Sequence, residues 1–237
     1  MQKTLFISDL HLSPQSTEIN QLFINFLQQK TGDIDALYIL GDLFEVWVGD
    51  VDDNFNASIL QAISAASQNC PIYFMYGNRD FMLSKKVAKK AGMRLLPDPS
   101  VIELYSRKIL LMHGDSLCSE DKMYQFYRYF VQSRLSQWIY LSLPLAWRQN
   151  IANGLRQQSK QRTQTLPAPI MDTHLPSLLK AMKKHQVDFL IHGHTHKPSI
   201  RYFWPEQKQI IVLSDWYKQG NVLTVNQDGS YRLSYFL

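Results

Sequence analysis

The sequence predicts an α/β protein whose layered core of strands and helices is interrupted by one helical segment. Two observations predict the core: short runs rich in Ile, Val, Leu, Phe and Tyr recur along the 237 residues, and amphipathic stretches separate many of them. A third observation predicts the interruption. From Lys122 to Pro169 this alternation stops, and apolar and basic residues at three- and four-residue spacing indicate two or more helices.

Continuous apolar runs are typical of buried strands. We expect strands at Thr4–Ile7, Ala36–Leu40, Ile72–Tyr76, Ile109–Met112, Phe189–Ile191, Ile210–Leu213 and Asn221–Val225. The stretches between them predict helices at Thr17–Gln29, Asn54–Gln68, Lys85–Ala91 and Leu175–His185. Near the end of the chain, Asp228-Gly229 lies between Val222–Val225 and Tyr231–Phe236, which predicts a hairpin.

The inserted segment also holds the excess charge of the chain. There are 25 Lys and Arg residues against 20 Asp and Glu, a formal net charge of +5. Seven of the basic residues and none of the acidic ones lie between positions 122 and 169, which leaves 18 basic and 20 acidic residues elsewhere. Such a segment is either a solvated helical surface or a site for an anionic partner. We therefore divide the chain into a core, residues 1–121 and 170–237, and a helical lid, residues 122–169. Eight aromatic residues lie in the lid, and we expect most of them to pack it against the core.

Length and cysteine content narrow the class of protein. A chain of 237 residues buries enough apolar surface to fold without disulfides or a structural metal. The two cysteines, Cys70 and Cys118, fit neither a disulfide framework nor a metal-binding spacing, which favours a reducing compartment. The apolar run Leu5–Ile7 is too short for a signal peptide, and Trp138–Trp147 falls far short of the about 20 residues that span a bilayer. We expect a cytoplasmic protein that does not cross a membrane.

Polar side chains follow five of the expected strands at the point where each strand ends. They are Asp9 and His11, Asp42, then Asn78, Arg79 and Asp80, then His113 and Asp115, and finally His192, His194 and His196. Sites in open α/β sheets form beyond the carboxyl ends of the strands, so these side chains are expected to meet there. The glycines before Asp42, Asn78 and His194 allow the sharp turns that would aim them.

Carboxylate, amide and imidazole groups without thiolate suit divalent ions such as Mn²⁺, Fe²⁺ or Zn²⁺. Such a set of ligands is too large for one tetrahedral ion but fits two ions about 3.5–4 Å apart that share a carboxylate. A single histidine after a strand is usually a hydrogen-bonded polar residue. Five motifs in one chain favour a dinuclear metal site instead.

The motifs Asp9-x-His11, Gly41-Asp42, Gly77-Asn78-Arg79-Asp80, His113 and Gly193-His194-x-His196 stand in the order of the signature of the calcineurin-like metallophosphoesterases, which the chain resembles. The resemblance implies a four-layer fold, with two mixed β-sheets packed together, helices outside and the helical insert as a cap. It also implies a set of metal ligands: Asp9, His11 and His196 for one ion, Asn78, His113 and His194 for the other, and Asp42 as the bridge.

The chain departs from the superfamily pattern at two positions. The second motif ends in Glu45 where the superfamily usually has Asp, a change that we place outside the ligand set. Arg79 stands where many relatives carry a histidine that protonates an alkoxide leaving group. Because arginine stays charged, it can bind phosphate oxygens but cannot act as a general acid. A phosphate leaving group, whose second pKa is about 6, needs no such proton, so this residue favours diphosphate cleavage over monoester cleavage.

A narrower resemblance, over essentially the full chain, is to the UDP-2,3-diacylglucosamine pyrophosphatase family of lipid A biosynthesis. It is carried by Ser8–Leu12, Leu37–Glu45, Gly77–Phe81, Met112–Asp115, Ile170–Asp172, Lys184–Val187 and Ile191–Pro198. It implies that water attacks the uridine-side phosphorus of UDP-2,3-diacylglucosamine and releases UMP and 2,3-diacylglucosamine 1-phosphate. It also implies Mn²⁺ as the preferred metal, and peripheral attachment to the cytoplasmic side of the inner membrane.

The same resemblance implies roles for individual residues. The catalytic residues would be Asp42, Asn78, Arg79 and His194, and the residues in contact with the substrate head group would be Asn78, Arg79, Asp121, Tyr124, Arg156, Ser159, Thr163 and His194. Near Leu166 the family often has a lysine, whose phosphate contact Lys160 or Arg162 would have to replace.

Three alternatives remain open at this stage. One is another calcineurin-like nucleotide diphosphatase or phosphodiesterase. A second is a nucleic-acid enzyme or binder, since basic residues interleaved with aromatic ones bind single strands. The third is a non-catalytic scaffold with a degenerate metal site, which seven filled ligand positions argue against. We expect the lipid-linked nucleotide as the partner, with no nucleic acid and no obligate protein partner.

Overall fold

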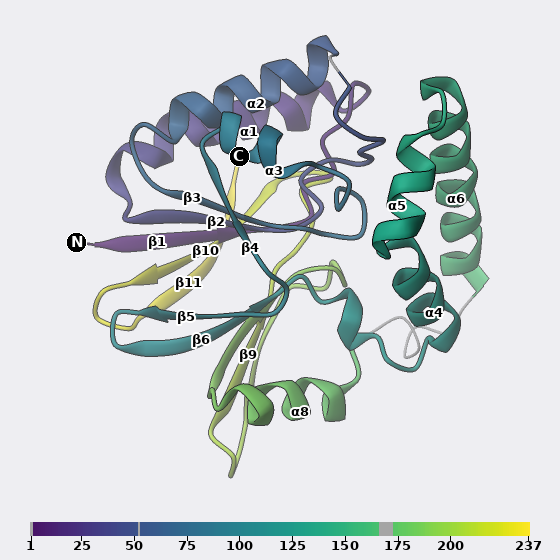
Figure 1. The fold of residues 1–237 in the computed structure, drawn as a ribbon. Helices are drawn as coiled ribbons and strands as arrows, with labels where there is room; N and C mark the ends of the chain where they lie inside the picture. The colour runs from purple at the N-terminus through teal and green to yellow at the C-terminus, as the bar shows by residue number, and fades with distance from the viewer. Residues whose placement is uncertain (1, 52, 166–172) are drawn as a thin grey trace.

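Two mixed β-sheets pack face to face, with helices on both outer faces (Figure 1). This computed structural model describes residues 2–51, 53–165 and 173–237, without the side chains of residues 160 and 162–165. The predicted α/β class and the four-layer arrangement are confirmed.

The six-stranded sheet has the order β11-β10-β1-β2-β3-β4. Four of its strands are parallel: β1 (Lys3–Ile7), β2 (Ala36–Leu40), β3 (Ile72–Met75) and β4 (Met93–Leu96). The antiparallel hairpin of β10 (Gly220–Asn226) and β11 (Tyr231–Phe236) completes it. The hairpin prediction is confirmed.

The five-stranded sheet has the order β5-β6-β7-β9-β8. Its parallel centre consists of β6 (Arg107–Met112), β7 (Phe189–His192) and β9 (Lys208–Val212). Its antiparallel edges are β5 (Ser100–Leu104) and β8 (Ser199–Phe203). We did not predict β4, β5 or β8. All three lie at sheet edges and are only partly buried, so they lack the continuous apolar run of the central strands.

Three apolar clusters hold the layers together. One lies between the sheets and joins residues such as Phe6 and Tyr38 to Leu111 and Ile191. A second lies under α1 (Thr17–Lys30), α2 (Asn54–Ala66) and α3 (Lys85–Lys90) on the outer face of the six-stranded sheet. The third packs α8 (Leu175–His185) on the other sheet. Short 3-10 turns at Thr31–Asp33 and Asp115–Leu117 complete the core.

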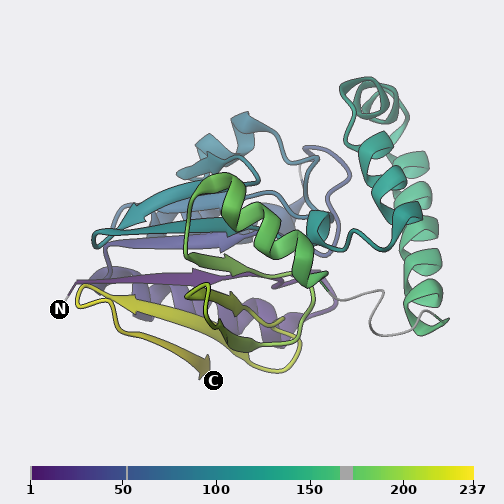
Figure 2. The same ribbon diagram turned by 90° about the horizontal axis from the view of Figure 1, so that it is seen from below.

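Three further helices, here called the cap helices, stand to one side of the sheets at the end opposite the N-terminus (Figure 2). They are α4 (Lys122–Val131), α5 (Arg134–Leu141) and α6 (Leu145–Thr165). Asp121 and Ser133 cap the N-termini of α4 and α5 by accepting hydrogen bonds from the Tyr124 and Ser136 amides. The prediction of two or more helices here is confirmed.

Our expectation that most aromatic residues pack the cap helices against the core is wrong. Phe126, Tyr129 and Trp138 are 70%, 80% and 68% exposed. Polar contacts attach the cap helices to the core instead, as described below, and many apolar side chains of α4 and α5 are exposed. Within the described residues, no helix is both long enough and apolar enough to cross a membrane.

Candidate active site

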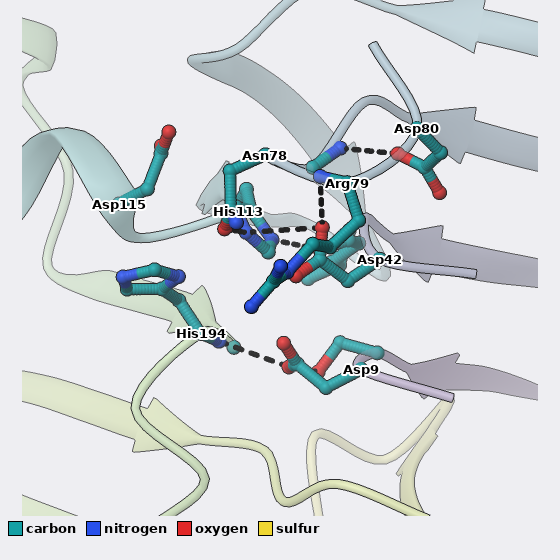
Figure 3. A network of polar contacts seen from close by, with 12 residues as sticks. Asp9, Asp42, Asn78, Arg79, Asp80, His113, Asp115 and His194 are labelled. Carbon is teal, nitrogen blue, oxygen red and sulfur yellow. Dashed lines mark hydrogen bonds and ion pairs between the residues drawn. The ribbon is translucent and has the colours of Figure 1, made fainter. Parts of the chain in front are cut away.

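The ends of the central strands bring the predicted site residues to one edge of the two sheets. Main-chain hydrogen bonds join the loops: the Asp9 amide donates to the Gly41 carbonyl (3.1 Å) and the Gly193 amide donates to the His113 carbonyl (2.9 Å). The His194 amide, after β7, donates to Asp9 Oδ2, after β1, at 2.9 Å, and side chains from both sheets face one another across a single space (Figure 3).

Five of the seven predicted metal ligands have left-handed backbone conformations. Their φ angles are 55° at Asp9, 50° at His11, 51° at Asp42, 70° at His194 and 56° at His196. Such conformations are uncommon for residues other than glycine and cost on the order of 1–3 kcal/mol each. Strained backbone of this kind clusters at functional sites, because the surrounding structure has to hold it.

Two glycines leave room for carboxylates. A Cβ at Gly77 would lie 2.0 Å from Asp42 Oδ1, and one at Gly193 would lie 2.3 Å from Asp9 Oδ2. The sequence-based reason, a sharp turn, holds for Gly41 with its φ of 89°. At Gly77 and Gly193 the backbone is not left-handed, and the close approach of a carboxylate is what requires glycine.

The seven predicted ligands lie together, in two groups that could each hold an ion. Asp9, His11 and His196 form one group, and Asp42, His113 and His194 form the other, with ligand atoms within 4.8 Å of one another in each. Asp42 faces both groups: Oδ2 lies 3.8 Å from His11 Nε2, and Oδ1 lies 3.8 Å from His113 Nε2. Asn78 Oδ1 lies 3.1 Å from His113 Nε2.

Three of the predicted ligand histidines have an acceptor outside the ligand set beside Nδ1. His11 Nδ1 lies 3.0 Å from Glu45 Oε2, His196 Nδ1 lies 3.2 Å from Asp215 Oδ2, and His113 Nδ1 donates to the Leu40 carbonyl at 2.9 Å. Each arrangement leaves Nε2 facing the centre of the site. This is the pattern by which outer groups orient metal-binding imidazoles.

The surroundings of the Asp9 carboxylate suit a bound cation. Its Oδ2 accepts hydrogen bonds from Ser8 Oγ (2.6 Å) and the His194 amide (2.9 Å). Its Oδ1 is buried and accepts no hydrogen bond within the described part of the chain, but lies 3.4 Å from His196 Nε2. A buried carboxylate oxygen aimed at imidazole nitrogens, without thiolate nearby, fits a divalent cation.

The pKa values show how strongly negative the site is. Burial alone would lower the pKa of His113, but Asp42, Asp115 and Asp9 raise it to about 9. In the same way Asp215 and Asp9 outweigh burial and raise the pKa of His196 to about 10. His194 differs, because burial and the neighbouring His113 lower its pKa to about 4, so it stays neutral and able to bind a metal.

Some of the residues predicted to contact the substrate lie at this site. The Tyr124 ring stacks near His194, with ring centroids 6.2 Å apart, and Arg156 Nε lies 2.7 Å from Glu45 Oε1. The Arg79 amide donates to Asp42 Oδ1 at 2.9 Å. Asp121 caps α4, and Ser159 lies on α6. The side chains of Thr163, Lys160, Arg162 and Leu166 lie outside the described residues.

Sequence reasoning missed two neighbours of the histidines. Asp215 contacts His196, and the Tyr217 ring stacks on His11 with centroids 5.5 Å apart. A signal for Asp215 was present, since it follows the end of β9 as the other site residues follow their strands.

A family model described as calcineurin-like phosphoesterase matches residues 2–198, and the chain belongs to this family. Among its relatives are proteins named UDP-2,3-diacylglucosamine hydrolase. That of Shewanella pealeana is 44% identical over 228 residues, which cover 96% of this chain and 95% of the relative. That of Escherichia coli is 44% identical with 95% of each chain covered, and that of Coxiella burnetii is 43% identical with 100% and 98% covered.

Proposed function

We propose that the protein hydrolyses the diphosphate bond of UDP-2,3-diacylglucosamine, a step of lipid A biosynthesis, by attack of water on the uridine-side phosphorus. The products are UMP and 2,3-diacylglucosamine 1-phosphate. The observation that carries the proposal is the convergence of seven predicted ligand side chains, in a chain 43–44% identical along its length to hydrolases of that name.

Asp9, His11 and His196 would hold one divalent ion, and Asn78, His113 and His194 a second, with Asp42 between them. We propose Mn²⁺ as the metal. Two bound divalent ions lower the pKa of a water molecule and stabilise negative charge on phosphoryl oxygens.

The chain's own residues position the substrate. Arg79 supplies a fixed positive charge for phosphate oxygens and cannot donate a proton, which fits a leaving group that departs as a phosphate. Arg79 Nε is buried and donates no hydrogen bond within the described residues, so it is available to a ligand. His194, with its lowered pKa, is neutral at pH 7 and also faces this space.

The lid of residues 122–169, which contains the cap helices, would hold the acyl chains and the head group. Exposed apolar side chains on α4 and α5, including Met123, Phe126 and Trp138, suit a lipid environment. Basic residues on the same helices favour an anionic surface. We infer that the protein works at the cytoplasmic face of the inner membrane as a peripheral protein.

The test measures UMP release in Mn²⁺ from UDP-2,3-diacylglucosamine, UDP-N-acetylglucosamine and a simple phosphodiester, in water labelled with oxygen-18. We expect release only from the lipid substrate, with the label in UMP. Equal rates on the three substrates would reject the lipid assignment, and label in the lipid phosphate would reject the attack on the uridine-side phosphorus. As a control, Asp42→Ala should lose activity together with bound metal, and full turnover by metal-depleted Asp42→Ala would contradict the metal mechanism.

A further inference from the structure

Glu45 connects the first metal group directly with the cap helices. One carboxylate oxygen, Oε2, lies 3.0 Å from His11 Nδ1, and the other, Oε1, lies 2.7 Å from Nε of Arg156 on α6. The His11 and Glu45 side chains are 3% and 9% exposed, whereas Arg156 reaches in from the surface and is 49% exposed.

The backbone of Glu45 is held in place for this double contact. Its amide donates to the Leu12 carbonyl at 2.9 Å, next to the bridge between Leu12 and Phe44. An aspartate here would be one methylene shorter and could not place its two oxygens against both His11 and Arg156. The departure from the usual Asp therefore gives this chain a link between the metal ligands and α6.

We propose that Glu45 is a positioning residue that couples metal binding at Asp9, His11 and His196 to the placement of α6. The reason is the chemistry of the imidazole. A cation bound by His11 Nε2 requires the ring proton on Nδ1, the nitrogen that faces Glu45. In the structure His11 Nδ1 is buried and makes no aligned hydrogen bond to a described residue, although Oε2 lies 3.0 Å away. A bound cation would fix the ring proton on Nδ1 and favour its donation to Oε2, and the carboxylate oriented in this way would hold Arg156.

The coupling is reciprocal, because two events that stabilise each other do so by the same factor. Whatever fixes Arg156 against Glu45 should strengthen metal binding at His11. This inference concerns metal binding and α6 alone, so it does not depend on the identity of the substrate and can fail or succeed independently of the proposed function.

A second arginine of α6 provides a matched control. Arg148 Nη1 donates to the Val48 carbonyl at 2.6 Å and so anchors the same helix to the core. Its acceptor is a main-chain oxygen three residues beyond Glu45, in a contact that involves no metal-binding side chain. Loss of Arg148 should therefore loosen α6 equally with and without metal.

The experiment is hydrogen–deuterium exchange of α6 in the full chain, with Mn²⁺ or with chelator, and without substrate. In the wild type we expect Mn²⁺ to slow exchange in α6 about fivefold, at the lower end of typical coupling between sites. In Glu45→Gln and Arg156→Met, Mn²⁺ should no longer slow exchange in α6. The Gln amide nitrogen would face either His11 or Arg156, both donors, so one contact is lost. In Arg148→Met, α6 should exchange faster both with Mn²⁺ and with chelator, and Mn²⁺ should still slow exchange by the same factor.

Bound Mn²⁺ is measured in each sample, since Glu45→Gln should also bind Mn²⁺ about 10–100-fold more weakly. The proposal is overturned if Mn²⁺ slows exchange in α6 of metal-loaded Glu45→Gln as much as in the wild type, or if Mn²⁺ does not slow exchange in α6 of the wild type. Should Glu45→Gln not fold, Arg156→Met decides by the same criterion, because this half-exposed side chain can be replaced without opening the core.

Discussion

Replacement of Arg128 by methionine tests how α4 is attached to the core. Arg128 Nε lies 2.5 Å from Asp115 Oδ2, and the two side chains are 24% and 2% exposed. Removal of one partner from a buried ion pair costs about 3–5 kcal/mol. Because Arg128 is partly exposed and the Tyr124 hydroxyl still faces the carboxylate at 3.4 Å, we expect a loss of about 2–3 kcal/mol in the free energy of unfolding. At about 2–4 °C per kcal/mol, the midpoint of thermal unfolding should fall by about 4–12 °C.

The assay is urea and thermal unfolding followed by circular dichroism, with Arg134→Met, an exposed arginine of α5, as the control. Although burial alone would raise the pKa of Asp115, His113 and Arg128 lower it. Ionised Asp115 therefore stabilises the folded state above its unfolded pKa of about 3.9, and this contribution is lost as the pH falls. The deficit of Arg128→Met should be present in full at pH 7 and shrink only as the pH falls below about 4. A deficit below about 0.5 kcal/mol at pH 7, or one that is independent of pH, refutes the reasoning.

Three further predictions follow from packing. Gly77→Ala should lose bound metal and activity by placing a Cβ against the Asp42 carboxylate, with a folded circular dichroism spectrum; metal content as in the wild type would contradict this. In Gly154→Ala the new Cβ, on helix α6, would have no atom within 4 Å. Urea titrations should show a free energy of unfolding that is unchanged or about 0.5–1 kcal/mol higher, and a clear decrease would contradict this prediction. Cys70 and Cys118 are both buried, and burial raises the pKa of Cys70 to about 11, so at pH 8 both thiols should react with a disulfide reagent only after unfolding.

Continuous apolar runs and strand-end motifs were sufficient to predict the central strands and the seven side chains that the structure brings together where those strands end. Edge strands and the exposed faces of the cap helices were not predictable in this way. Strand β8 (Ser199–Phe203) alternates between partly buried and exposed positions, so its pairing with β9 defines it more than its own composition does. The exposure of Phe126 and Trp138 was not predictable either, because an amphipathic pattern shows which side chains share a face and not what covers that face.

The net charge of +5 shows the same division between sequence and structure. Its location in residues 122–169 is a property of the sequence, and an anionic partner was one interpretation of it. The structure shows that Arg128, Arg148 and Arg156 each contact the core, at Asp115, the Val48 carbonyl and Glu45. Part of the basic character of the cap helices therefore attaches them to the core, whereas Lys122 and Arg134 are exposed.

The sequence by itself determined the α/β class, the order of the motifs and the identity of the chemistry-bearing residues, because strand burial and side-chain chemistry are local properties of the chain. Only the tertiary structure decided how these residues are held: the left-handed backbone at Asp9 and Asp42, the contact of Asp215 with His196, and the bridge from His11 through Glu45 to Arg156. Those features depend on which distant segments meet where the two sheets end, and no local pattern of residues encodes such a meeting.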